Sequence, residues 1–161
     1  MIGTMVFAAL LAAAAVNDVL RLRIPNVIPL LLVAGFVLEV GLGLVVRPLD
    51  HLLAMVIVLA ILLPVFAFDM LGGGDVKLLA AAALWLGLAN VPLLLICVGI
   101  LGGLFTAFWL PLRWLVARLL PNRRLPASLQ LKAALPYGVP ISVVALLLHL
   151  DVAGELLARG G

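Results

Sequence analysis

The chain has 161 residues, of which 67% are hydrophobic and only 11% charged, with a net charge of +3 and a mean hydropathy of +1.41. A soluble domain of this size needs more polar surface, so we expect one polytopic membrane domain over residues 1–161. No basic patch with interleaved aromatic residues is present, which argues against a nucleic-acid partner. Cys97, the single cysteine, has no intrachain disulfide partner and belongs to no zinc motif.

Six apolar segments approach the length of about 20 residues that a membrane-spanning helix needs. We therefore expect an all-α bundle of six transmembrane helices, over residues 2–20, 27–46, 51–70, 76–88, 92–117 and 135–150. The uncharged stretch from Leu78 to Leu112 must fold back. As one helix it would reach about 52 Å, against a hydrocarbon core of about 30 Å. Residues Ala89 to Pro92 are the natural turn.

The distribution of Lys and Arg predicts the orientation of the bundle. With the N-terminus outside the cytoplasm, only Arg47 and Arg159 fall on the outer side. The inner segments then hold Arg21, Arg23, Lys77, Arg113, Arg118, Arg123, Arg124 and Lys132. This positive-inside bias places Asp18 and Asp75 at the cytoplasmic membrane face.

Asp18 ends an otherwise uncharged apolar run. Taken alone, it is best interpreted as a solvated carboxylate at a helix end, paired with Arg21 or Arg23. Pro25 is predicted to stop the first helix, and Asn26 can cap the second. These residues indicate a tight inner connection between the first two segments.

Asp75 follows Gly72, Gly73 and Gly74, between the third and fourth apolar segments. It can be a helix N-cap, which the helix dipole favours. A cap does not need three glycines, however. Glycines permit unusual backbone angles and the close approach of another chain, such as a substrate strand. The pattern therefore favours function for Asp75, and Lys77 either moderates its charge or extends to the lipid headgroups.

Two carboxyls from separate helices can share a proton. The ionised one can take a proton from water while the other donates to a carbonyl or a leaving nitrogen. We predict Asp18 and Asp75 as the catalytic pair of a membrane aspartyl peptidase, which needs no metal and no cofactor. Asp69 is a weaker rival for the second carboxyl. Glu39 is better explained as a protonated side chain bonded to a neighbouring helix.

Two other classes stay open. One is a small proton-coupled transporter that uses Asp18, Glu39 and Asp75 as relay groups, although the chain has no repeated half. The other is a catalytically silent subunit of a pilus or secretion machine. His149, near the outer end of the last segment, lies too far from both aspartates for a metal site.

Three patches in the same order resemble the prepilin leader peptidases, which are membrane aspartyl proteases with a Gly-x-Gly-Asp motif. Residues 72–75 match that motif, and residues 76–79 (Val-Lys-Leu-Leu) continue the similarity. Asp18, followed by Ile-Pro-Asn at 24–26, is similar to the first aspartate motif of the family. Residues 135–139 (Leu-Pro-Tyr-Gly-Val) form the third patch.

The resemblance implies a multi-pass enzyme of the bacterial inner membrane that cuts a basic leader from a type IV-like prepilin on the cytoplasmic side. The apolar N-terminal helix of the prepilin would lie beside the enzyme in the bilayer, and Gly72 and Gly74 would let the Asp75 loop approach the substrate backbone. Longer members carry paired cysteines in an N-terminal portion and N-methylate the pilin, and the sequence has no counterpart of that portion. We therefore expect the short type, for Flp pili or archaeal preflagellins, without methyltransferase activity.

Overall fold

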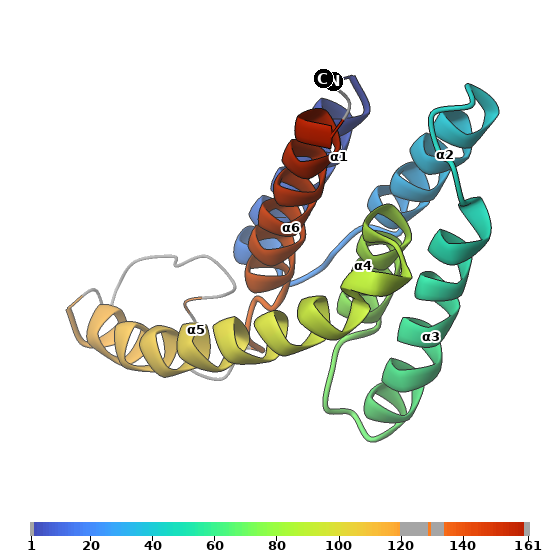
Figure 1. Ribbon diagram of the computed structural model, residues 1–161. Coiled ribbons are helices and arrows are strands. Elements are labelled where there is room, and N and C mark those ends of the chain that lie inside the picture. Colours follow the sequence, from blue (N-terminus) through green and yellow to red (C-terminus); the bar gives the residue numbers. More distant parts are fainter. Residues whose placement is uncertain (1, 120–128, 130–133, 160–161) are drawn as a thin grey trace.

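The structure is a computed structural model that describes residues 2–119, 129 and 134–159. Within them the chain is all-helical, as predicted, and contains no strand. Six α-helices and a short 3-10 helix follow one another along the chain: α1 (Ile2–Arg21), α2 (Val27–Gly41), α3 (Pro48–Ala67), α4 (Gly73–Leu86), η1 (Leu88–Asn90), α5 (Val91–Leu119) and α6 (Gly138–Arg159). Figure 1 shows the C-terminal half of α5 projecting beyond the other helices. Most of the predicted basic loop from Arg118 to Lys132 lies outside the described residues.

Several helices begin or end a few residues from the expected positions. The segment expected over 27–46 is helical only to Gly41, and Gly43 then adopts a φ of +72°, which suits glycine and reverses the chain. α3 begins at Pro48, because proline is well accommodated in the first helical turn, and ends at Ala67 rather than at residue 70. The predicted fold-back occurs at Gly87, with a φ of +79°, and η1.

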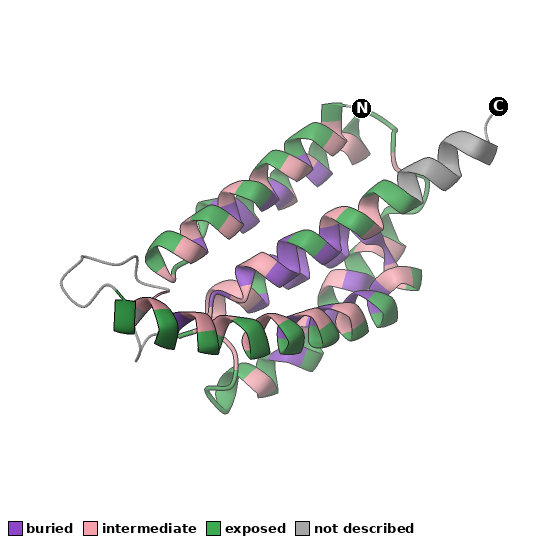
Figure 2. Ribbon diagram, turned by 90° about the vertical axis from the view of Figure 1, so that its left-hand side faces the viewer, coloured by how far each residue is buried: buried purple, intermediate pink, exposed green. Residues whose placement is uncertain are grey.

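In the described part of the chain, three helical stretches are long and apolar enough to cross a membrane: Ile2–Arg21, Pro48–Ala67 and Leu88–Val116. Val27–Gly41 and Gly138–Asp151 are shorter apolar helices. Figure 2 shows buried residues gathered on the faces that the helices turn toward one another, whereas the outward faces are exposed. Because those outward faces carry many large apolar side chains, the chain has the surface of a membrane protein.

α4 is the central helix of the bundle. It packs against α2, α3 and α6, and every residue from Leu78 to Leu86 is buried. A helix that is apolar on all sides is stable only when other helices surround it. Its 14 residues extend only about 21 Å, so α4 is an internal element whose first turn stays near one end of the bundle.

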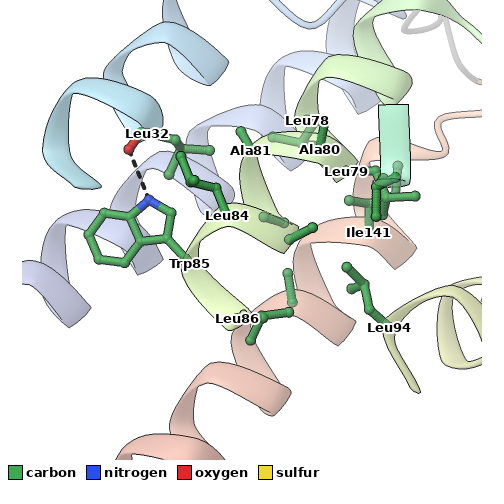
Figure 3. Packing of buried hydrophobic residues seen from close by; sticks show 14 of the residues in the cluster. Leu32, Leu78, Leu79, Ala80, Ala81, Leu84, Trp85, Leu86, Leu94 and Ile141 are labelled. Atoms are coloured by element: carbon green, nitrogen blue, oxygen red, sulfur yellow. Dashed lines mark hydrogen bonds between the residues drawn. The ribbon is translucent and has the colours of Figure 1, made fainter. Parts of the chain in front are cut away.

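Aromatic rings hold the far end of α4 in place. The Trp85 indole N–H donates to the Leu32 carbonyl oxygen of α2 at 2.9 Å, as Figure 3 shows. Its ring stacks on Phe7 of α1 with 4.9 Å between centroids. His149 of α6 also lies against Phe7, at 4.6 Å. His149 therefore belongs to the packing of this end of the bundle, while Asp75 lies in the opposite, first turn of α4.

Candidate active site

One cavity of about 590 Å³ lies where the end of α1 meets the start of α4. Its walls come from the last turn of α1, the α1–α2 connection and the glycine-rich start of α4. The lining residues are Asp18, Arg21, Leu22, Arg23, Ile24, Pro25, Asn26, Gly72, Gly73, Gly74 and Asp75. The structure thus brings together two carboxyls that the sequence analysis paired from different apolar segments.

Asp18 is held in one position by the start of α6. Its side chain is only 5% exposed, and the backbone N–H of Gly138 donates to its Oδ2 at 2.7 Å across 120 residues of sequence. Arg21 and Arg23 line the same cavity, but neither forms an ion pair with Asp18. The interpretation of Asp18 as a solvated, arginine-paired carboxylate is therefore wrong, because α6 covers it.

Gly138 has no room for a side chain. A Cβ atom there would lie 2.9 Å from Asp18 Oδ2, 3.0 Å from Asp18 Cβ and 3.1 Å from Ile24 Cδ1. The absence of a side chain lets the backbone amide of α6 reach the carboxylate. Sequence reasoning noted Gly138 only within the third family-like patch, and that patch was the signal for its role beside Asp18.

Asp75 occupies the first turn of α4, ahead of the expected span 76–88. The N-cap residue is Gly72, not Asp75, and the Gly72 backbone N–H bonds back to the Asp75 carboxyl, as an acidic side chain in the first helical turn can do. Burial raises the pKa of Asp75 to about 7, with the neighbouring Asp18 carboxylate as a second cause. At neutral pH the cavity therefore favours one proton on the pair.

The three glycines before Asp75 act through close packing. None of them has a positive φ, so the expected unusual backbone angles are not found. A Cβ on Gly72 would meet Asp75 Oδ2 at 2.8 Å, one on Gly73 would meet the Phe66 ring at 3.2 Å, and one on Gly74 would meet Ile24 Cβ at 3.1 Å. The space beside these glycines was predicted to admit a substrate strand. Beside Gly74, Ile24 of the chain itself already occupies it.

The α1–α2 connection differs from its predicted form. α1 ends at Arg21, before Pro25, and Leu22 takes the left-handed conformation with a φ of +51°. Asn26 stands at the N-cap position of α2, but its side chain makes no capping bond. Its Oδ1 accepts a hydrogen bond from Lys77 Nζ at 3.0 Å instead. Lys77 is absent from the cavity wall, so it connects α4 to this turn rather than contacting the carboxyls.

The other acidic candidates lie elsewhere. Asp69 is exposed in the turn after α3, with a φ of +55°, and does not line the cavity. The carboxyl of Glu39 fills the space beside Gly3 of α1, so it contacts a neighbouring helix, but it does not form the predicted hydrogen bond with the described residues of that helix. Within the described part of the chain, no three His, Cys, Asp or Glu side chains gather into a group that could hold a metal ion.

The chain matches the sequence model of the type IV leader peptidase family over residues 5–107, which include both aspartates of the cavity and the glycines before Asp75. No curated protein matches the chain, and no solved structure does either.

Proposed function

The chain belongs to the type IV leader peptidase family, and on this premise we propose that it is an aspartyl endopeptidase for Flp-type prepilins, with Asp18 and Asp75 as its catalytic pair. The observation that carries the proposal is that these two carboxyls, from α1 and α4, line one cavity. Both have a backbone N–H donor, Gly138 for Asp18 and Gly72 for Asp75. Such donors hold each carboxyl in a defined orientation, as acid–base catalysis requires.

The different surroundings of the two carboxyls assign their roles in this mechanism. We assign the proton of the pair to Asp75, whose pKa is raised to about 7, and the ionised role to Asp18, which accepts the Gly138 N–H. Asp18 takes a proton from water, the water oxygen attacks the scissile carbonyl carbon, and Asp75 gives its proton to the carbonyl oxygen. As the tetrahedral intermediate collapses, Asp18 passes its proton to the leaving nitrogen and Asp75 recovers one from a hydroxyl.

The position of the pair supports cleavage at the cytoplasmic face of the inner membrane. Arg21 and Arg23 line the cavity beside Asp18, and the positive-inside bias assigns these arginines to the cytoplasm. In this proposal the leader enters the cavity from the cytoplasm, and the apolar helix of the prepilin stays in the bilayer. The carboxyl pair performs hydrolysis without a metal or cofactor.

A proton relay through Glu39 has no support in the geometry. Glu39 lies beside Gly3, near the start of α1, whereas Asp18 lies near the end of that helix. Glu39 is not part of the cavity wall. The transporter alternative therefore lacks the connected carboxyls that it needs.

The test is cleavage of a co-expressed Flp-type prepilin, followed by gel shift, with membrane levels measured for each variant. We expect Asp18→Asn and Asp75→Asn each to lower the cleavage rate by about 100-fold or more, the size of an acid–base contribution. Asp69→Asn is the matched control, because Asp69 is exposed and asparagine tolerates its positive φ. Asp69→Asn and Glu39→Gln should cleave like the wild type.

Wild-type cleavage rates in either cavity variant would contradict the proposal. So would a wild-type protein, present at normal membrane levels, that leaves the prepilin uncut. Proton-dependent flux in liposomes that Glu39→Gln abolishes would then establish the transporter.

A further inference from the structure

A second hollow lies on the lipid-facing side of α2, α3 and α4, with a volume of about 410 Å³. We name it the α2–α3 groove. Each helix contributes residues at helical spacing: Pro29, Leu30 and Val33 from α2, with Asn26 at its N-cap, Met55 and Leu59 from α3, and Lys77, Ala80 and Ala81 from α4. Because residues three or four apart lie on one helix face, the three stripes run along the helices rather than across them.

The groove has a simple origin in the packing. α2 and α3 both pack against α4 but make few or no contacts with each other. Between them Ala80 and Ala81 of α4 form the floor of the groove, and both are almost fully buried.

The groove is continuous with the catalytic cavity. Asn26 lines both, and the hydrogen bond from Lys77 Nζ to Asn26 Oδ1 lies at their shared boundary. Apart from Asn26 and Lys77, every residue of the groove is apolar. From Lys77 to Ala81, the groove follows α4 for about 6 Å away from the carboxyls. One end is therefore polar and next to the carboxyls, and the other is apolar and directed into the bundle's lipid-facing surface.

We propose that the α2–α3 groove binds the apolar helix of the substrate, so that the residues preceding that helix pass Asn26 and enter the cavity. This inference rests on the proposed function, because it needs a substrate with a cleavable polar leader joined to an apolar helix. Continuity with the cavity selects this occupant: a helix seated between α2 and α3 points its N-terminal end at Asp18 and Asp75. The groove thereby selects substrates by the helix that follows the cleaved bond.

The test is photo-crosslinking in the Asp75→Asn background, where the prepilin stays intact. A photo-reactive phenylalanine analogue replaces Leu30 or Leu59 of the groove, or Leu31 or Leu63 as matched controls on the same helices. Leu30, Leu31 and Leu63 are 67%, 47% and 55% exposed, and neither control lines the groove. We expect crosslinks from Leu30 and Leu59 to the apolar helix of a co-expressed full-length Flp-type prepilin, and none from the controls.

A kinetic arm uses Leu30→Trp and Leu31→Trp in the otherwise wild-type enzyme. Leu30→Trp should raise the KM for full-length prepilin by about tenfold, the effect of losing one well-packed contact, and Leu31→Trp should not change it. Equal crosslinking from groove and control positions, or crosslinks from Leu30 and Leu59 to lipid alone, would overturn the groove assignment. Crosslinking does not require cleavage, so failure of the groove and failure of the peptidase proposal give different results.

Discussion

Gly138→Ala is the substitution that most directly tests whether α6 positions the proposed catalytic carboxyl of Asp18. Gly138 is the first residue of α6, and its N–H donates to Asp18 Oδ2 at 2.7 Å. An added Cβ would lie 2.9 Å from that same oxygen and 3.0 Å from Asp18 Cβ. Because the Cβ atom of Asp18 is also too close, rotation of the carboxyl alone cannot relieve the contact. α1 and α6 must separate.

The size of the effect follows from these distances. An ordinary van der Waals contact begins at 3.4 Å, so the carboxylate must shift by roughly 0.5 Å and its hydrogen bond must lengthen or bend. A misplacement of about 1 Å in a catalytic group costs up to about 100-fold in rate. Overpacking also costs about 1–3 kcal/mol in stability. We expect kcat to fall by about 10- to 100-fold, with a smaller change in KM and a lower thermal midpoint.

The assay is the initial rate of prepilin cleavage by purified enzyme in proteoliposomes, with the thermal midpoint measured in detergent. Gly99→Ala is the matched control, because Gly99 lies within α5 and a Cβ there meets nothing within 4 Å. That variant should cleave at the wild-type rate. If Gly138→Ala has wild-type kcat, Gly138 does not position Asp18 and the reasoning is refuted. A lower midpoint with unchanged kcat would also refute it, since Gly138 would then be structural only.

Two further predictions concern titration and packing. The pKa of Asp75 is about 7 in the folded chain, against an ordinary 3.8. Between pH 3.8 and about 7, the Asp75 carboxyl therefore keeps its proton in the folded chain and loses it in the unfolded chain. The stability of the wild type should therefore fall as the pH rises from about 4 to 7, and then level off. Asparagine carries no such proton. The thermal midpoint of Asp75→Asn should therefore exceed that of the wild type clearly at pH 8 and only slightly near pH 4. An equal difference at both pH values would contradict the raised pKa. Trp85→Phe removes the N–H that donates to the Leu32 carbonyl oxygen. Thermal unfolding should show a loss of about 1–3 kcal/mol in stability. An unchanged thermal midpoint would show that this hydrogen bond contributes little.

The family match covers residues 5–107, yet residues beyond it complete the site. Gly138 lies outside the matched range and bonds Asp18. In this structure α6 therefore does more than cover the bundle, because it supplies the donor that orients one carboxyl. Variants in the 135–139 patch should consequently affect catalysis as well as packing.

The sequence by itself determined the class of the protein and singled out the two carboxyls of the candidate site. Continuous apolar segments predict helices because each helix satisfies its own backbone hydrogen bonds in lipid. Charged residues near apolar segments are costly and few, so Asp18 and Asp75 could be recognised without a structure. The length of the stretch from Leu78 to Leu112 required a fold-back, and the residues from Ala89 to Pro92 indicated its position. All of these inferences use properties that are local along the chain.

Only the tertiary structure decided which faces meet. Asp18 contacts Gly138, and Asn26 contacts Lys77, through 120 and 51 residues of intervening sequence. α4 is apolar on nearly every side, so its hydrophobic pattern identified no preferred face. The glycines before Asp75 proved to accommodate Ile24 and Phe66 rather than unusual angles. The groove forms because α2 and α3 pack on α4 and not on each other. This arrangement depends on how side chains of different helices fit together, so the sequence of a single helix carries no periodic pattern that predicts it.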